Sequence, residues 1–345
     1  MGGGRLYSLI KVFLKPIQVV YCSAVARRNA AFDRGRRVVT FDRPVISVGN
    51  VSVGGTGKSP MVAHILHLLV GAGRRPCVAM RGYGSSRRRD GRSDEAEEYR
   101  AIFPGLPVVA QPNRTLGLME LFATPEGESV DCIVLDDGFQ HRRIARQLDI
   151  VLLDASKRPL EDEPLPIGRL REPMASLRRA DVVAVMHAEA VVEAEVTRIV
   201  NEVMALNPGV LVVVGEHRWT GVDVLGVDGF QPVSWLAGKR VLPVCAIGNP
   251  APFLAKVEAE AGDVLTPIVL RDHDPYSTRT VRRLIRSATG AEAMVTTAKD
   301  WAKLKSVPAA DWPCPVVRPR LEVFLRSGGD ALAEKVLSAA ARLPE

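Results

Sequence analysis

One stretch near the start of this 345-residue chain, VISVGNVSVGGTGKSP (Val45–Pro60), constrains the fold more than any other. It opens with an apolar run that predicts a buried strand, and a glycine-rich loop follows at once. Lys58 and Ser59 close the loop, and the apolar spacing of Met61–Leu69 predicts a helix beginning there. Backbone N–H groups of such a loop and of the helix start form a concave anion site. This order of strand, loop and helix predicts a P-loop.

The loop departs from the Walker A pattern at one position, because Ser52 stands where the first glycine is expected. The residues that we assign to the nucleotide are Gly54, Gly55, Thr56, Gly57, Lys58 and Ser59. In such a loop the lysine reaches the β- and γ-phosphates of ATP, and the serine hydroxyl binds Mg²⁺. The competing interpretation is a glycine-rich turn with a chance Lys-Ser pair. The strand before it and the helix after it favour the P-loop.

A second motif is typical of the same site. The apolar run Asp131–Leu135 predicts a buried strand, and Asp136 and Asp137 follow directly at its end. An apolar strand that ends in aspartate is the Walker B arrangement, in which a carboxylate holds Mg²⁺ directly or through water. We therefore predict a metal site formed by Ser59, Asp136 and Asp137. The alternative is a pair of aspartates with a purely structural role.

The remaining pattern alternates strands and helices along both halves of the chain, which predicts an α/β fold. Further strands are predicted at 76–80, 106–110, 149–154, 181–186, 210–214, 240–246, 264–269, 293–297 and 315–317, and helices at 190–206, 252–261, 278–289 and 330–342. Asn207-Pro208-Gly209 breaks the pattern. We predict a P-loop NTPase-like domain with a mostly parallel sheet at 38–208 and a second, smaller α/β domain at 209–345.

The first 37 residues form a separate segment. Leu6, Leu9, Phe13 and Ile17 follow at steps of three or four, while Lys11 and Lys15 share another face. Charges and Pro16 leave too short an apolar run to span a bilayer. An amphipathic helix with an arginine-rich flank predicts binding to an anionic lipid surface. The alternative is a helix packed on the protein's own core.

The formal net charge of +7 indicates an anionic partner but does not choose among nucleic acid, lipid headgroups and phosphorylated substrates. A protein that only binds nucleic acid would leave the two Walker motifs unexplained, so we expect no nucleic acid. The five cysteines form no C-x-x-C pair, and we expect core thiols in a reducing cytosol.

Several charged residues have two interpretations each. Arg81 follows the predicted strand at 76–80 and either contacts a phosphate or lies at the surface. Arg171 lies in a proline-rich loop that binds an anion or merely connects two strands. Asp94 either has a functional role or only stabilises the start of a helix, and spacing favours the second. His273 stands between two aspartates, where spacing alone favours an ordinary surface loop.

Together these pieces resemble the tetraacyldisaccharide 4′-kinase family, the lipid A 4′-kinases of Gram-negative bacteria. The matching pieces run in order as the N-terminal apolar segment, VISVGNVSVGGTGKSP, RGYG, SDEA, QPNR, DDGFQH, PIGRLREP, RDHDPY and TAKD. The family's serine or threonine at the position of Ser52 also accounts for the imperfect Walker A pattern. This chain departs from the family by SDEA in place of GDEP, by Asp274 in place of a second histidine, and by Ala298 in TAKD.

The resemblance implies a two-domain P-loop kinase held at the cytoplasmic face of the inner membrane by its N-terminal helix. Such a kinase uses ATP and Mg²⁺ to phosphorylate the 4′-hydroxyl of an acylated glucosamine disaccharide 1-phosphate, giving lipid IVA. It also implies that Asp94 is the catalytic base, paired with His273. By the same resemblance, Arg81, Arg114 and Arg171 bind the phosphate of the lipid or the transferring group.

Another class of protein has a similar loop. ParA/MinD-like ATPases share the core Gly54–Ser59 and act as switches on membranes or DNA. They carry a lysine at the position of Val53, and they need no catalytic Asp–His pair. These two differences favour the kinase.

Overall fold

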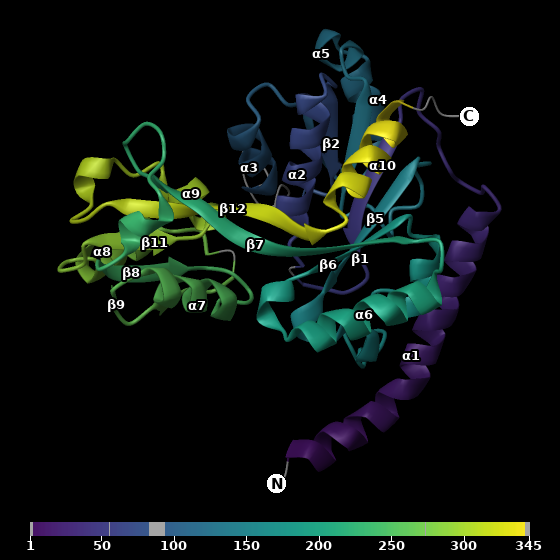
Figure 1. Cartoon of the computed structure of the whole chain (residues 1–345), viewed down its shortest axis with the longest axis horizontal. Coiled ribbons are helices and arrows are strands. Elements are labelled where there is room, and N and C mark those ends of the chain that lie inside the picture. Colours follow the sequence, from purple (N-terminus) through teal and green to yellow (C-terminus); the bar gives the residue numbers. More distant parts are fainter. Residues whose placement is uncertain (1–2, 55, 83–93, 273, 342–345) are drawn as a thin grey trace. The chain divides into compact units, whose positions relative to one another are not determined.

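The computed structural model describes residues 3–54, 56–82, 94–272 and 274–341. The chain forms two compact units, of which unit 1 comprises Met1–His217 and Val323–Glu345 and unit 2 comprises Arg218–Glu322. Two long strands, β7 (Leu211–Val224) and β12 (Val316–Ser327), run from one unit into the other (Figure 1).

Unit 1 is built on a sheet with the strand order β7-β6-β5-β1-β4-β2-β3. Its strands besides β7 are β1 (Val45–Asn50), β2 (Pro76–Met80), β3 (Val108–Ala110), β4 (Cys132–Asp136), β5 (Leu148–Asp154) and β6 (Val182–Met186). Neighbouring strands in this order pair in parallel. Both faces of such a sheet are covered, so its strands are continuous apolar runs rather than alternating ones.

Helices cover the two faces of this sheet. One face carries α2 (Lys58–Gly71), α3 (Asp94–Ile102) and α10 (Gly329–Ala341), and the other carries α4 (Arg114–Phe122) and α6 (Glu193–Leu206) (Figure 1). A short helix, α5 (Pro125–Glu128), follows α4. Alternate residues of β1 face the two layers, with Ile46 in the core under α2 and Val45 in the core beside α4. This arrangement confirms the predicted α/β fold.

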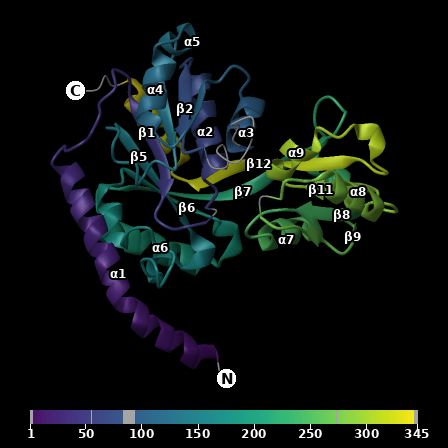
Figure 2. The ribbon, with the colours of Figure 1, turned by 180° about the vertical axis from the view of Figure 1, so that it is seen from behind.

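The first helix, α1 (Gly3–Asp33), continues through Pro16 and runs alongside the rest of unit 1 (Figure 2). Its polar face contacts the unit, since Lys11 and Lys15 pair with Glu163 at 3.1 and 3.2 Å. Its apolar face is exposed, with the side chains Val12, Phe13, Ile17, Val19 and Val20. Among the described residues, no helix is long and apolar enough to cross a bilayer.

Unit 2 contains β8 (Arg240–Cys245), β9 (Asp263–Val264), β10 (Ile268–Val269) and β11 (Ala293–Thr296), in the order β10-β8-β11-β12 with β9 also on β8. Its helices are α7 (Ala251–Glu260), α8 (Thr278–Ser287) and α9 (Ala298–Leu304). Short 3-10 helices of the chain lie at Ala155–Lys157, Pro159–Glu161, Met174–Arg179, Ala188–Ala190, Val233–Leu236 and Ala309–Asp311. The strand predicted at 264–269 is two strands, because Pro267 interrupts the pairing.

The division into units differs from the predicted domains 38–208 and 209–345. The break at Asn207–Gly209 only separates α6 from β7, and unit 1 continues to His217. The last helix returns to unit 1, where Leu332 and Val336 join the core formed by α2. β12 is long enough to carry the chain back there, whereas its polar, alternating second half does not resemble a buried strand in the sequence.

Candidate active site

The loop after β1 has the conformation that its glycines allow. Gly57 caps α2 with φ 77°, and Gly54 has φ 102°, both in the left-handed region. The side chain of Thr56 is buried, and its hydroxyl accepts a hydrogen bond of 2.9 Å from the Asn50 amide. The loop therefore leads from the end of β1 directly into the first turn of α2, as the P-loop prediction requires. Gly55 lies outside the described residues.

A histidine of β7 sets the space available at the end of this loop. A Cβ atom on Gly57 would collide with the ring of His217, whereas a Cβ on Gly54 would meet nothing within 4 Å. Glycine at position 57 is thus required by both backbone conformation and contact. At position 54 the requirement is conformational only.

We expect Gly57→Ala to lower the free energy of unfolding by about 2–5 kcal/mol, combining about 1–2 for the left-handed backbone with about 1–3 for overpacking against His217. Gly54→Ala is the matched control and should cost only the backbone part, about 1–2 kcal/mol. Urea unfolding of both variants measures the difference. Equal losses in the two variants would contradict a tight contact between Gly57 and His217.

The two Walker B aspartates come to the P-loop because β4 pairs with β1, with Asp136 opposite Val48. Asp136 is buried and accepts a hydrogen bond of 2.9 Å from the Tyr99 hydroxyl. Tyr99 belongs to α3. Burial and the neighbouring Asp136 carboxylate raise its pKa well above the ordinary value, so Tyr99 is a neutral donor.

Asp137 lies between two cations. The Lys58 ammonium is 3.4 Å from Oδ1, and one Arg171 Nη atom donates to both carboxylate oxygens at 2.9 and 2.8 Å. Arg114, which is buried, donates to the backbone carbonyl of Asp137 at 3.1 Å. Burial alone would raise the pKa of the Asp137 carboxyl, but Lys58 and Arg171 outweigh burial and hold it below its ordinary value.

This lowered pKa predicts a stability effect at acidic pH. The ionised Asp137 contributes stability above its ordinary pKa, about 4, and loses it as the pH falls through the lower folded value. We expect the difference in unfolding free energy between wild type and Asp137→Asn to be full near pH 7 and to shrink below about pH 4. Urea unfolding across this range measures it. A difference that stays constant down to about pH 3 would contradict the charge pairing.

Arg171 reaches Asp137 through pairing between two distant segments. Ser52 in the P-loop and Leu170 form an antiparallel bridge. On either side of it, Val53 N donates to Arg169 O at 2.8 Å and Arg171 N donates to Val51 O at 2.7 Å. The proline-rich loop is therefore attached to the P-loop, and Arg171 is placed beside Lys58 and Asp137.

The structure describes three other predicted site residues, Arg81, Asp94 and His273, to different extents. Arg81 is exposed just after the carboxyl end of β2, on the same sheet edge as the P-loop. Asp94 is the first residue of α3, but its side chain lies outside the described part of the structure. His273 lies outside it altogether. The structure thus groups Thr56, Gly57, Lys58, Ser59, Asp136, Asp137, Arg114 and Arg171.

Sequence reasoning missed three residues of this site, namely Asn50, Tyr99 and His217. Asn50 is the final residue of β1, and a polar side chain at the end of an apolar strand was a usable signal. Tyr99 lies five positions after Asp94 on α3, with no spacing that points to Asp136. His217 belongs to the part of β7 that the sequence did not predict as strand.

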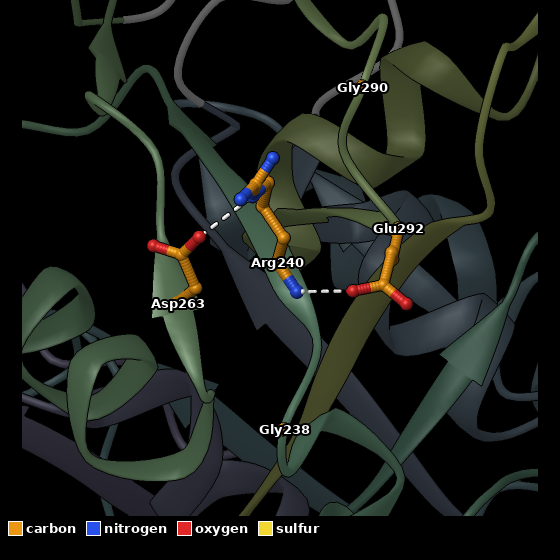
Figure 3. A pocket seen from close by; sticks show the side chains of 5 residues that line it. All are labelled: Gly238, Arg240, Asp263, Gly290 and Glu292. Carbon is orange, nitrogen blue, oxygen red and sulfur yellow. Dashed lines mark hydrogen bonds and ion pairs between the residues drawn. The ribbon is translucent and has the colours of Figure 1, made fainter.

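Figure 3 shows a pocket of about 310 Å³ on unit 2, lined by Gly238, Arg240, Asp263, Gly290 and Glu292. Arg240 Nε donates to Asp263 at 2.7 Å, and its backbone N–H donates to Glu292 at 2.8 Å. These residues lie at the amino ends of strands, whereas ligand sites of parallel sheets lie at the carboxyl ends. The two interactions of Arg240 stabilise the starts of these strands. We therefore assign the pocket no catalytic role.

Comparison with known proteins identifies the family. A family model described as tetraacyldisaccharide-1-P 4′-kinase matches residues 10–339. The tetraacyldisaccharide 4′-kinase of Geobacter metallireducens is 36% identical over 87% of this chain and 90% of its own, and that of Anaeromyxobacter sp. (strain K) is 32% identical over 99% and 94%. A crystal structure of "apo" form LpxK from Aquifex aeolicus in complex with ATP is 26% identical, with a TM-score of 0.76 over 96% of this chain and 99% of that one. The chain therefore belongs to the tetraacyldisaccharide-1-P 4′-kinase family, the ATP-dependent kinases of lipid A biosynthesis.

Proposed function

We propose that the site at the carboxyl ends of β1 and β4 transfers the γ-phosphoryl group of ATP to the 4′-hydroxyl of tetraacyldisaccharide 1-phosphate, giving lipid IVA. The observation that carries this proposal is the convergence of Lys58 and Arg171 on Asp137, beside Asp136 and the P-loop. Phosphoryl transfer needs little covalent help from the protein, and depends on positioning and on neutralising negative charge. Two cations next to an anion-binding loop supply both.

The donor set fits Mg²⁺. Ser59 offers a hydroxyl, and Asp136 and Asp137 offer carboxylate oxygens, which are the hard ligands that this ion prefers. Tyr99 donates to Asp136 Oδ2 and thereby orients this carboxylate. When bound, Mg²⁺ supplies charge neutralisation on the phosphates. Lys58, released from Asp137 by the nucleotide, would then bind the phosphates directly.

We further propose Asp94 as the catalytic base, paired with His273 as the family resemblance implies. Support comes from α3, the helix that Asp94 begins, because Tyr99 of the same helix donates a hydrogen bond to Asp136. The helix that carries Asp94 therefore contacts the Walker B strand. The carboxylate accepts the proton of the 4′-hydroxyl while the new oxygen–phosphorus bond forms. The bond to the β-phosphate oxygen breaks, and ADP leaves with that electron pair.

The three arginines have different proposed roles. Arg171, next to Lys58, would neutralise the transferring phosphoryl group. Arg81, exposed at the end of β2, would bind the phosphate of the lipid. Arg114 is buried and donates a hydrogen bond to the backbone carbonyl of Asp137, so we propose that it positions Asp137.

The test is transfer of label from γ-labelled ATP to purified disaccharide 1-phosphate in detergent, with Mg²⁺ and the full chain. We expect label in the lipid product. Hydrolysis of ATP without labelled lipid would overturn the proposal and favour a ParA/MinD-like switch ATPase.

We also propose that α1 binds the inner-membrane surface on its cytoplasmic side. Its lysines and Gln18 are engaged with the Glu163 loop, so the apolar side chains face outward. Phe13 and Val20, 76% and 69% exposed, would lie among the lipid headgroups and upper acyl chains.

This proposal predicts weaker vesicle binding in the double variant Phe13→Asp, Val20→Asp. Burial of each apolar side chain in the membrane contributes about 1.5–3 kcal/mol to the binding free energy. Loss of both should therefore weaken binding to vesicles with anionic lipid by more than about tenfold. Vesicle sedimentation measures this. Val192→Asp, at a valine 72% exposed elsewhere on unit 1, is the control and should bind as wild type. If wild type, the double variant and Val192→Asp sedimented equally with vesicles, α1 would have no part in membrane binding.

A further inference from the structure

A second group of polar side chains in unit 1 has no assigned role in phosphoryl transfer and shares only His217 with the candidate active site. It consists of His187, Glu189 and His217, whose ligand atoms all lie within 4.8 Å of one another. His187 Nδ1 is 3.3 Å from a Glu189 carboxylate oxygen. The two imidazole rings lie edge to face, with centroids 4.6 Å apart. We refer to these three residues as the His-Glu-His cluster.

Strand pairing brings the cluster together. β6 and β7 run in parallel with Val185 opposite Val214, so His187, just beyond β6, lies near His217. His187 has φ 60°, and this left-handed turn leads into the 3-10 helix that carries Glu189. A β-region residue could not make this turn, so the local conformation directs Glu189 back toward the two rings.

One nitrogen of the cluster is available as a ligand. His217 Nε2 is buried and has no hydrogen-bond partner among the described residues. A buried nitrogen without a partner costs free energy, so its retention calls for an explanation.

We propose that the His-Glu-His cluster binds a divalent transition metal ion of the Zn²⁺ class. Two imidazole nitrogens and one carboxylate form a common three-residue set for such ions, with a further position left for water. The cluster differs in chemistry from Ser59, Asp136 and Asp137, whose ligands are all oxygen and suit Mg²⁺. The two sites therefore select different metals.

The position of the cluster gives the bound ion a structural consequence. The His217 ring packs against Gly57 at the end of the P-loop. A metal ion that holds the His217 ring in place also restricts the space next to Gly57, because this ring is its neighbour. The ion would stabilise the folded P-loop region without touching the transferring group.

The experiment is titration of the full chain, prepared without a histidine tag and freed of metal, with Co²⁺ in excess Mg²⁺. We expect one Co²⁺ per chain, with visible absorption bands of a four- or five-coordinate site that Zn²⁺ abolishes. Glu189→Gln is exposed and nearly isosteric, so it should fold normally and lose at least about 100-fold in affinity, since even outer partners of metal ligands are worth about 10–100-fold. His187→Gln and His217→Gln should lose at least as much.

His67→Gln is the matched control, because this exposed histidine of α2 packs against Phe103, just after α3, and takes no part in the cluster. It should bind Co²⁺ as wild type does. Zn²⁺ should also raise the melting temperature of wild type and of His67→Gln, but not of Glu189→Gln. Wild-type protein that binds no stoichiometric Co²⁺, or cluster variants that bind it as well as His67→Gln, would overturn the proposal.

Discussion

Asn in place of Asp94 is expected to lower kcat by about 10²–10⁴-fold, the usual contribution of a positioned general base. The KM for ATP should change little, because the nucleotide is assigned to the P-loop and not to the start of α3. Only the carboxylate form can accept the proton of the 4′-hydroxyl, and the amide cannot. Steady-state label transfer from ATP to the disaccharide lipid measures both constants.

Glu97→Gln is the matched control for this variant. Glu97 lies on the same helix and pairs with Arg100 at 2.9 Å on the exposed side. Loss of this ion pair should leave kcat within about twofold of wild type, because a surface ion pair contributes only about 0–1 kcal/mol to stability. If Asp94→Asn kept the kcat of the control, Asp94 would have no part in the chemistry.

The second large effect is expected for Asp136→Asn, which should lower kcat by about 10²–10³-fold, as for loss of one preorganised electrostatic group. Asp136 lies at the end of β4, buried beside the P-loop strand. An amide in its place binds Mg²⁺ weakly, so the Mg²⁺ concentration needed for half-maximal activity should also rise. Activity measured against Mg²⁺ concentration tests both effects, and thermal unfolding verifies that the variant is folded.

Tyr99→Phe separates the carboxylate from its hydrogen-bond donor. It keeps Asp136 and removes only the hydroxyl that donates to it at 2.9 Å. A hydrogen bond to a charged group is worth about 1.5–3 kcal/mol, so kcat should fall by about tenfold to 100-fold, less than in Asp136→Asn. An equal or larger loss in Tyr99→Phe would mean that Asp136 does not act through its charge.

The fold was largely predictable because most strands of unit 1 are buried on both faces. The predicted strand at 76–80 coincides with β2, and that at 181–186 differs from β6 by one residue. β7 and β12 were predicted too short, because beyond Val214 and Val317 polar residues such as Glu216 and Arg318 interrupt the apolar run. Periodicity identifies burial, and these strand halves are only partly buried.

The P-loop and the strand ending in Asp136 could be predicted because each motif lies within one short segment. Lys58 and Ser59 follow the glycines directly, and Asp136 ends its own strand. The contact between Arg171 and Asp137 joins residues far apart in sequence, and it depends on the bridge between Ser52 and Leu170. No local pattern encodes that bridge.

The sequence by itself determined the chemistry of single segments: an anion-binding loop, a pair of aspartates at a strand end and an amphipathic first helix. Only the tertiary structure decided which distant side chains meet them. It placed Tyr99 on Asp136, His217 against Gly57, and the last helix in unit 1. The reason is physical, since local spacing sets helix and strand formation, whereas contacts across the sheet depend on strand order and register.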